Sequence, residues 1–221
     1  MRVQMAFSKQ KYFHPRAPSG EYKSQFGQDY YLEKLGLLKR DGFFIEVGSN
    51  HPVYNSNSYY LEKSLGWRGI SIDGVDFSND FLKLRANTSF VHCLIDSENG
   101  EAEFYEVQNV DGWETQISSM YESNLELGKG FKATKKIVQT KRLSDFQNEN
   151  QFIDLCLIDV EGHEFSVLDS IDWENKPPRV FVIENMGEFY PRNHLIQYMS
   201  NKGYKFVARV GTTDDIFLSG L

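Results

Sequence analysis

The sequence predicts an α/β fold: a doubly wound, mostly parallel sheet of seven strands that ends in an antiparallel hairpin. Short apolar runs alternate with helical patterns from about residue 24 onward, which is typical of strand-helix-strand units. Most of these runs are apolar throughout, as strands covered on both faces are. The last two runs face each other across residues 211–214, and so short a connection makes them pair antiparallel.

The helices and strands alternate along the chain after an N-terminal arm. Residues 1–23 have no sustained period, which predicts the arm. A helix is expected over residues 27–38 with Ser24 as N-cap. Further helices are expected at residues 56–65, 78–85 and 163–170, and between Pro191 and Gly203. The strands are expected at residues 43–47, 69–73, 90–96, 152–160, 179–185, 204–210 and 215–219.

The middle of the chain interrupts this alternation. Asn99 and Gly100 are typical of a hairpin turn, and the alternating residues after them predict an exposed strand. Residues 108–135 have no clear period, and a long irregular stretch in a compact domain is usually functional. We therefore expect a single domain over residues 24–221 with an irregular insertion, or lid, at about residues 108–135.

Composition places the chain among globular proteins. Of its 221 residues, 40% are apolar and 25% are charged, close to the average of soluble domains. No apolar run approaches the roughly 20 residues of a membrane helix, and the first residues lack the apolar core of a signal peptide. We expect a cytoplasmic protein without membrane insertion. Two cysteines, Cys93 and Cys156, cannot form a disulfide framework and are expected to be buried thiols.

The net charge of -7 argues against a general nucleic-acid-binding protein, which needs a basic face. One segment, residues 129–142, differs because it has no acid. Its basic residues are Lys129, Lys132, Lys135, Lys136, Lys141 and Arg142. Such a run is either a solvated loop or a contact for a phosphate-bearing substrate.

Carboxylates stand at the ends of the first five expected strands. They are Glu46, Asp73, Asp96, Asp159 and Glu184. Ligands of open doubly wound sheets bind at the carboxyl ends of the strands. Single acids there often cap the next helix, but five in succession predict a site for ribose hydroxyls and a cationic amino-acid group. The glycine fingerprint of dinucleotide binding is absent after Gly48, which disfavours a nicotinamide oxidoreductase.

Five segments then indicate a family. They are SQFGQD (24–29), FFIEVGSN (43–50), SNSYYLEKSLGWRGISID (56–73), IVQTKRLSDF (137–146) and LIDVEGHEFSVL (157–168). With them the chain resembles, from Ser24 to the C-terminus, the FkbM-type S-adenosylmethionine-dependent methyltransferases, which have the Rossmann-like class I methyltransferase fold. The family usually has an acid and a second glycine where this chain has His51 and Pro52, and Glu-Pro where it has Asp73 and Gly74. Pro52 removes a backbone N–H and restricts His51 to extended conformations.

The resemblance implies a binding site for S-adenosylmethionine. Its expected residues are Gln28, Asp29, Glu46, Gly48, Asn50, Asp73 and Asp96. Glu46, Gly48 and Asn50 would line the methionine part, where Gly48 lets the backbone approach closely. Asp73 would hold the ribose, and Asp96 would lie near the adenine. Gln28 and Asp29 would close the pocket or, equally well, form an exposed first-turn pair.

The implied reaction is the in-line attack of a hydroxyl oxygen on the sulfonium methyl group, which requires positioning and removal of a proton. Asp159, Glu161 and His163 are the expected catalytic residues. A strand extended through the two acids would point both carboxylates to one side. His163 is the better base at neutral pH, with a helix cap or a surface histidine as the alternative. Together with Glu184, the acids would suit a divalent cation, and spacing leaves open whether one binds.

The resemblance suggests O-methylation of a sugar, a glycan or a nucleotide-linked sugar. Trp113, Tyr121 and Phe131 in the insertion either stack on a sugar ring or pack as ordinary aromatics. The basic segment indicates RNA 2′-O-methylation as the alternative. A non-catalytic binding module on the same fold is a third interpretation, prompted by His51 and Pro52.

Overall fold

The computed structural model describes residues 11–13, 20–108, 114–121, 132–148, 150–175 and 177–220. The strands of the main sheet are β1 (Lys11–Phe13), β2 (Phe43–Val47), β3 (Arg68–Asp73), β4 (Thr88–His92), β8 (Leu155–Ile158), β9 (Val180–Glu184), β10 (Tyr204–Val210) and β11 (Asp214–Ser219). The helices are α1 (Gln28–Lys34), α2 (Tyr59–Leu65), α3 (Ser78–Leu84), α4 (Glu164–Asp169) and α5 (Arg192–Asn201).

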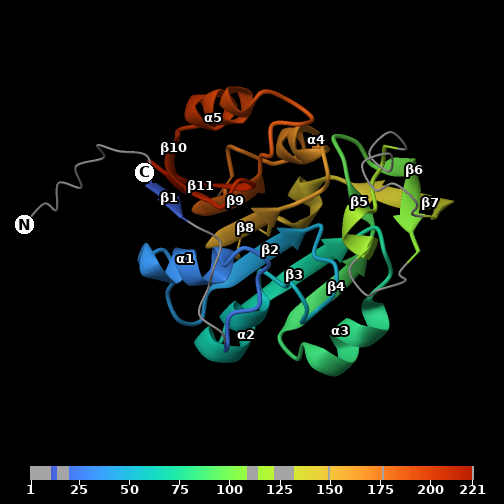
Figure 1. The fold of residues 1–221 in the computed structure, drawn as a ribbon, viewed down its shortest axis with the longest axis horizontal. Helices are drawn as coiled ribbons and strands as arrows, with labels where there is room; N and C mark the ends of the chain where they lie inside the picture. Colours follow the sequence, from blue (N-terminus) through green and yellow to red (C-terminus); the bar gives the residue numbers. More distant parts are fainter. Residues whose placement is uncertain are drawn as a thin grey trace, which may run out of the picture.

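The main sheet has the order β1-β10-β11-β9-β8-β2-β3-β4 (Figure 1). The strands from β9 to β4 are parallel, whereas β11 is antiparallel to both of its neighbours. This arrangement confirms the predicted doubly wound, mostly parallel sheet with an antiparallel C-terminal hairpin. Besides the seven expected strands, the described residues of the N-terminal arm contribute β1, which pairs parallel with β10.

Helices cover both faces of the sheet (Figure 1). On one face, α1 and α2 bury Leu32 and Leu61. On the other, α4 and α5 bury Leu168 and Leu195. Every residue of β8 and β9 is buried, which explains why their sequences are apolar apart from Glu184 at the end of β9.

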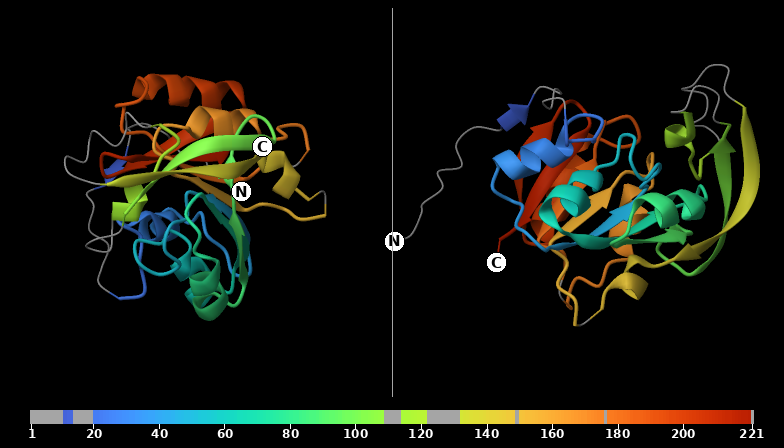
Figure 2. Two further views of the ribbon diagram at one scale, coloured as in Figure 1. Left: turned by 90° about the vertical axis from the view of Figure 1, so that its right-hand side faces the viewer. Right: turned by 90° about the horizontal axis from the view of Figure 1, so that it is seen from below.

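The strand predicted at residues 90–96 is divided between two sheets. β4 ends at His92, and β5 (Leu94–Ile95) belongs to a second sheet of order β5-β7-β6. In that sheet β6 (Gly100–Val107) is antiparallel to β7 (Ala133–Lys141). Because β5 and β6 each pair with β7 and not with each other, the hairpin turn predicted at Asn99 and Gly100 is wrong. Figure 2 shows the second sheet projecting from one side of the main sheet.

The described residues of the insertion pack against β6. Glu114–Ile117 forms a 3₁₀ turn, and Ser119 pairs with Tyr105 of β6. Residues 133–135, expected at the irregular end of the insertion, are the start of β7. Of the three aromatic residues singled out there, Trp113 and Phe131 lie outside the described residues, as does Lys129 of the basic segment.

Three smaller expectations can be compared with the structure. Cys93 and Cys156 are buried free thiols, as expected. The N-cap of α1 is Gly27 in a left-handed conformation and not Ser24. Within the described residues, every helix is too short or too polar to span a membrane.

Candidate functional site

A cavity lies at the carboxyl ends of β2, β3, β8 and β9. It holds about 1010 Å³ of empty space, part of which is open solvent. The chain leaves β2 toward one face of the sheet and β8 toward the other, and ligands bind where neighbouring strands diverge in this way. The described part of the insertion lines the cavity through Thr115, Gln116, Ser118, Ser119 and Met120.

Gly48 brings the ends of β2 and β8 into direct contact. Its φ of +78° is unfavourable for other residues, and a Cβ built there would lie 1.6 Å from the carbonyl oxygen of Asp159. The Asp159 N–H donates to the Val47 carbonyl at 3.0 Å, and the Gly48 N–H donates to the Ile72 carbonyl at 2.9 Å. Only glycine at position 48 allows these two strand ends to meet.

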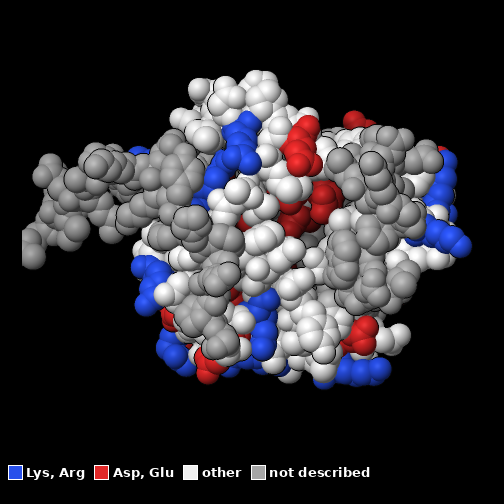
Figure 3. Space-filling view, viewed as in Figure 1, with Lys and Arg blue, Asp and Glu red and all other residues white. Residues whose placement is uncertain are grey.

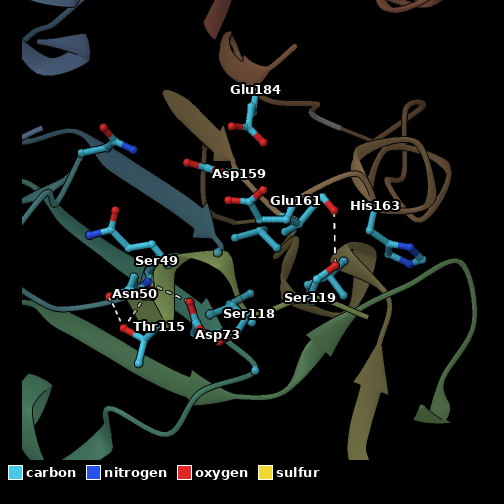
Figure 4. Close-up of a pocket in the computed structure, with 18 of the residues that line it drawn as sticks. Ser49, Asn50, Asp73, Thr115, Ser118, Ser119, Asp159, Glu161, His163 and Glu184 are labelled. Carbon is cyan, nitrogen blue, oxygen red and sulfur yellow. Dashed lines mark hydrogen bonds between the residues drawn. The ribbon is translucent and has the colours of Figure 1, made fainter. Parts of the chain in front are cut away.

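The loop after β2 is held by Asp73 at the end of β3. The carboxylate of Asp73 accepts the backbone N–H groups of Asn50 and Val75, each at 2.7 Å. Asn50 has a left-handed φ of 48°, and its side-chain amide donates to Thr115 of the insertion at 3.3 Å. Burial raises the pKa of Asp73 to about 6. Asn50 and Asp73, both expected at the cofactor, therefore line the cavity side by side (Figure 4).

His51 and Pro52, the departures from the family motif, have structural partners. Nδ1 of His51 accepts the backbone N–H groups of Val53 and Tyr54, both at 3.1 Å, so this nitrogen carries no proton. Burial lowers the pKa of His51, which favours the same neutral form. The Pro52 carbonyl accepts from the buried guanidinium of Arg85 at 2.9 Å. The loop is thus organised by an imidazole and an arginine in place of a second glycine.

Several polar atoms in the cavity wall lack a hydrogen-bond partner among the described residues. Oγ of Ser49 and Oδ1 of Asn57, near the loop after β2, are two of them, and both are buried. A buried polar group without a partner is unfavourable, so a bound ligand would stabilise both. Neither residue was expected at the site from the sequence, although Ser49 directly follows the expected Gly48.

Asp159, Glu161 and Glu184 bring their carboxylates together on the opposite side of the cavity (Figure 4). One oxygen of each lies within 4.8 Å of the others. The sequence predicted that a strand extended through Asp159 and Glu161 would point both carboxylates to one side. This prediction was wrong, because β8 ends at Ile158 and the chain does not continue as a strand. It turns through Glu161 and Gly162, with φ of 53° and 98°, and the turn brings the two acids together. The cluster offers oxygen ligands suited to a divalent cation.

Crowding and burial favour the protonated forms of these acids. Burial, followed by the charge of Glu161, raises the pKa of Asp159. Burial and the nearby Glu164 raise the pKa of Glu161 to about 7. Burial and Asp159 raise the pKa of Glu184, whose Oε2 has no hydrogen-bond partner among the described residues. Carboxyl groups with such pKa values can exchange protons near neutral pH.

His163 lines the cavity at the start of α4. It occupies the N-cap position of α4 but makes no side-chain cap hydrogen bond. It is only 8% exposed, so it is not a surface histidine. Its Nδ1 lies 2.9 Å from the hydroxyl of Tyr121, and its Nε2 lies 3.2 Å from Oδ1 of Asp96. The insertion therefore reaches this histidine through Tyr121.

Gln28 lines the cavity beside a residue that the sequence analysis did not identify. Its side-chain amide donates to Asp214 at 2.9 Å. Burial raises the pKa of Asp214 to about 6. Asp214 begins β11 directly after the turn of the predicted C-terminal hairpin, and the pairing of β11 with β9 brings it to the cavity.

Three expected cofactor residues do not line the cavity: Asp29, Glu46 and Asp96. Glu46 is buried behind the sheet and accepts from the hydroxyls of Ser58 at 2.6 Å and Ser71 at 2.9 Å. Side chains alternate along β2, and this places Glu46 on the side of α2. Asp29 is fully buried and accepts backbone N–H groups around the start of α1. Asp96 reaches the site only through its contact with His163.

A doubly wound sheet with a polar cavity at its strand ends is the usual arrangement of an α/β domain with a small-ligand site. A family model narrows this class: residues 46–206 match the methyltransferase FkbM domain. The chain belongs to this family of methyltransferases.

Two further comparisons add little. Comparison with curated proteins found no match. Among solved structures, the chain is similar to a precorrin-6y C5,15-methyltransferase from Geobacter metallireducens GS-15. The two are 12% identical, 91% of each chain is covered, and the TM-score is 0.48.

Proposed function

We propose that the protein transfers the methyl group of S-adenosylmethionine to a hydroxyl group of a sugar, a glycan or a related small molecule. One observation carries the proposal. The Gly48 loop, which allows close backbone approach, directly contacts the strand end that carries Asp159. A cofactor held by the loop would therefore present its methyl group beside carboxylates that can accept a proton.

The residues of the cavity fit the cofactor. Asp73 and the partnerless oxygen of Asn57 can accept from ribose hydroxyls or from the ammonium group. Oγ of Ser49 can donate to the carboxylate of the methionine part. When bound, S-adenosylmethionine supplies an activated methyl group, and the remaining task of the protein is to orient the acceptor and receive its proton.

Asp159 is the best placed base. Its backbone is fixed against β2 at Gly48, so the position of its carboxylate relative to the cofactor loop is determined by two strands. Glu161 and Glu184 lie beside it and can share the proton. General-base catalysis of this kind contributes roughly 10²- to 10⁴-fold to the rate. Nδ1 of His163 lies beside the hydroxyl of Tyr121. His163 would therefore hold the insertion at this end of the cavity and exchange protons with the carboxylates.

Calorimetry and a transfer assay test the proposal. We expect heat of binding with S-adenosylhomocysteine at a stoichiometry of one, and incorporation of label from methyl-labelled S-adenosylmethionine into hydroxylated acceptors. Well-folded protein that gives no heat with either form of the cofactor would exclude the proposed function.

We further propose that a divalent cation binds to the carboxylates of Asp159, Glu161 and Glu184. It would lower the pKa of the acceptor hydroxyl and so replace the base. The cluster geometry supports it. Turnover that a chelator abolishes and that Mg²⁺ or Mn²⁺ restores would establish it, and turnover unaffected by the chelator would leave deprotonation to the carboxylates alone.

A further inference from the structure

The acceptor must approach from the acidic side of the cavity, if the proposed function holds. The expected cofactor residues Asn50 and Asp73 follow β2 and β3, while Asp159 and Glu184 lie at β8 and β9, on the other side of β2 in the sheet. We call Asp159, Glu161, Glu184 and Asp214 the acid half of the cavity. An acceptor that reaches the methyl group lies over this acid half.

No lysine or arginine is found among the described residues that line the cavity. Glu184 is 7% exposed, and its Oε2 has no hydrogen-bond partner in the described part of the chain. Figure 3 shows acidic side chains gathered in a hollow of the molecular surface, with basic side chains on the same face but outside the hollow. Even a divalent cation bound to three of the four carboxylates would leave the acid half with net negative charge when all four are ionised.

The basic segment does not supply the missing positive charge, as far as the structure describes it. Lys135 pairs with Glu103 at 2.6 Å, and Lys136 pairs with Glu106, both across the second sheet. None of the described basic residues of the segment lines the cavity. The basic segment therefore belongs largely to β7 and its cross-strand pairs.

We infer that the acceptor carries no phosphate near its reacting hydroxyl. It is a neutral or ammonium-bearing polyol, and the site rejects nucleotide-linked sugars and RNA. Repulsion between a phosphate charge and a single carboxylate at ~7 Å, with an effective dielectric constant of ~20, lowers affinity about 50-fold. The charges of the acid half act together, so discrimination between an alcohol and its phosphorylated form exceeds tenfold even after screening by salt.

The cofactor and its product provide a matched pair of charge probes that needs no acceptor. S-Adenosylmethionine carries one more positive charge than S-adenosylhomocysteine, located at the reacting centre. We expect the ratio of their dissociation constants to favour S-adenosylmethionine at about pH 8, above the pKa of about 7 of Glu161, and this preference to fall roughly tenfold in a Glu161→Gln/Glu184→Gln variant. Calorimetry with a chelator present measures both ligands.

The exposed variant Glu174→Gln is the control and should leave the ratio unchanged. An unchanged ratio in the double variant, with both ligands still bound, would overturn the inference. Absence of binding by either ligand to the wild-type protein would instead overturn the proposed function, so the two failures are distinguishable.

The charge of the acceptor can then be measured directly. The protein is incubated with methyl-labelled S-adenosylmethionine and a deproteinised cell extract, and the labelled products are passed over an anion exchanger. We expect the label in the unretained fraction, and treatment of the extract with phosphatase should not reduce it. Label retained on the exchanger and lost after phosphatase treatment contradicts the inference. If no label is transferred, the ratio measurement decides.

Discussion

The two sides of the cavity treat their carboxylates in different ways. Asp73, on the side of β2 and β3, accepts two backbone N–H groups at 2.7 Å and fixes the loop that contains Asn50. Half-buried Asp159 and buried Glu184, on the side of β8 and β9, lie beside each other, and desolvation raises the pKa of both. The comparison separates two roles of an acid at a strand end. A hydrogen-bonded acid holds a ligand loop, whereas a crowded acid is suited to proton transfer.

The largest effect expected from this difference is on the rate. Asp159→Asn keeps the shape of the side chain and removes its capacity to take a proton, so methyl transfer should fall roughly 10²- to 10⁴-fold. The dissociation constant of S-adenosylhomocysteine should change little, because that ligand is held on the other side. Single-turnover assays and calorimetry measure the two quantities. Full turnover in this variant would show that a residue other than Asp159 is the base.

The contact between the two sides can be broken at Gly48. In Gly48→Ala the new methyl group would overlap the Asp159 carbonyl, so the strand ends must separate. We expect a loss of affinity for S-adenosylhomocysteine of about 100-fold, because overpacking against backbone costs about 3 kcal/mol. Gly36→Ala is the matched control: its φ is also left-handed, at +69°, but nothing lies within 4 Å. Equal effects of the two substitutions would show that backbone strain alone matters.

Titration of Asp73 should affect cofactor affinity more moderately. Ribose hydroxyls donate to the ionised carboxylate, so affinity for S-adenosylhomocysteine should fall by up to tenfold per pH unit below about pH 6. The free energy of unfolding of the ligand-free protein depends on pH in the opposite direction. A carboxyl with a raised pKa binds its proton more tightly in the folded state, so its contribution to the free energy of unfolding rises as pH falls from about 6 toward 4.

Calorimetry at a series of pH values, compared with Asp73→Asn, isolates this contribution from the other acids. The variant should lack the part of the pH dependence that Asp73 causes. Identical profiles for the two proteins would place the ribose away from Asp73.

The smallest effect is expected at the insertion. Tyr121→Phe removes the hydroxyl that lies 2.9 Å from Nδ1 of His163. A net hydrogen bond of about 1 kcal/mol corresponds to a roughly fivefold effect, and we expect it in turnover and not in the affinity for S-adenosylhomocysteine. Steady-state kinetics with a fixed acceptor would measure it. A change confined to cofactor affinity would instead place Tyr121 on the cofactor side.

Local patterns predicted the main sheet well. Residues 43–47 and 179–185 are mostly apolar because helices cover both faces of these strands, and such runs can be recognised without knowledge of their neighbours. The prediction of one strand at residues 90–96 was wrong because it also depended on an apolar run alone. A continuous apolar run does not show that the chain passes from one sheet to another at Cys93.

The candidate site was predicted in outline and not in detail. Asn50, Asp73, Asp159, Glu161 and His163 do line one cavity. Glu46 does not, although its place beside Gly48 suggested it, because the side-chain alternation of β2 turns it away. Asp214 does, because β11 inserts between β9 and β10, and an antiparallel return from the end of the chain leaves no local signal near the other acids.

The sequence by itself determined the order of strands and helices, the family and the acids at the strand ends. These depend on periodicity and on short motifs, which are properties of neighbouring residues. Only the tertiary structure decided which acids face one another, which lie behind the sheet, and that the described basic residues of β7 lie outside the cavity. The physical reason is that burial and charge interactions arise between strands brought together from distant parts of the chain.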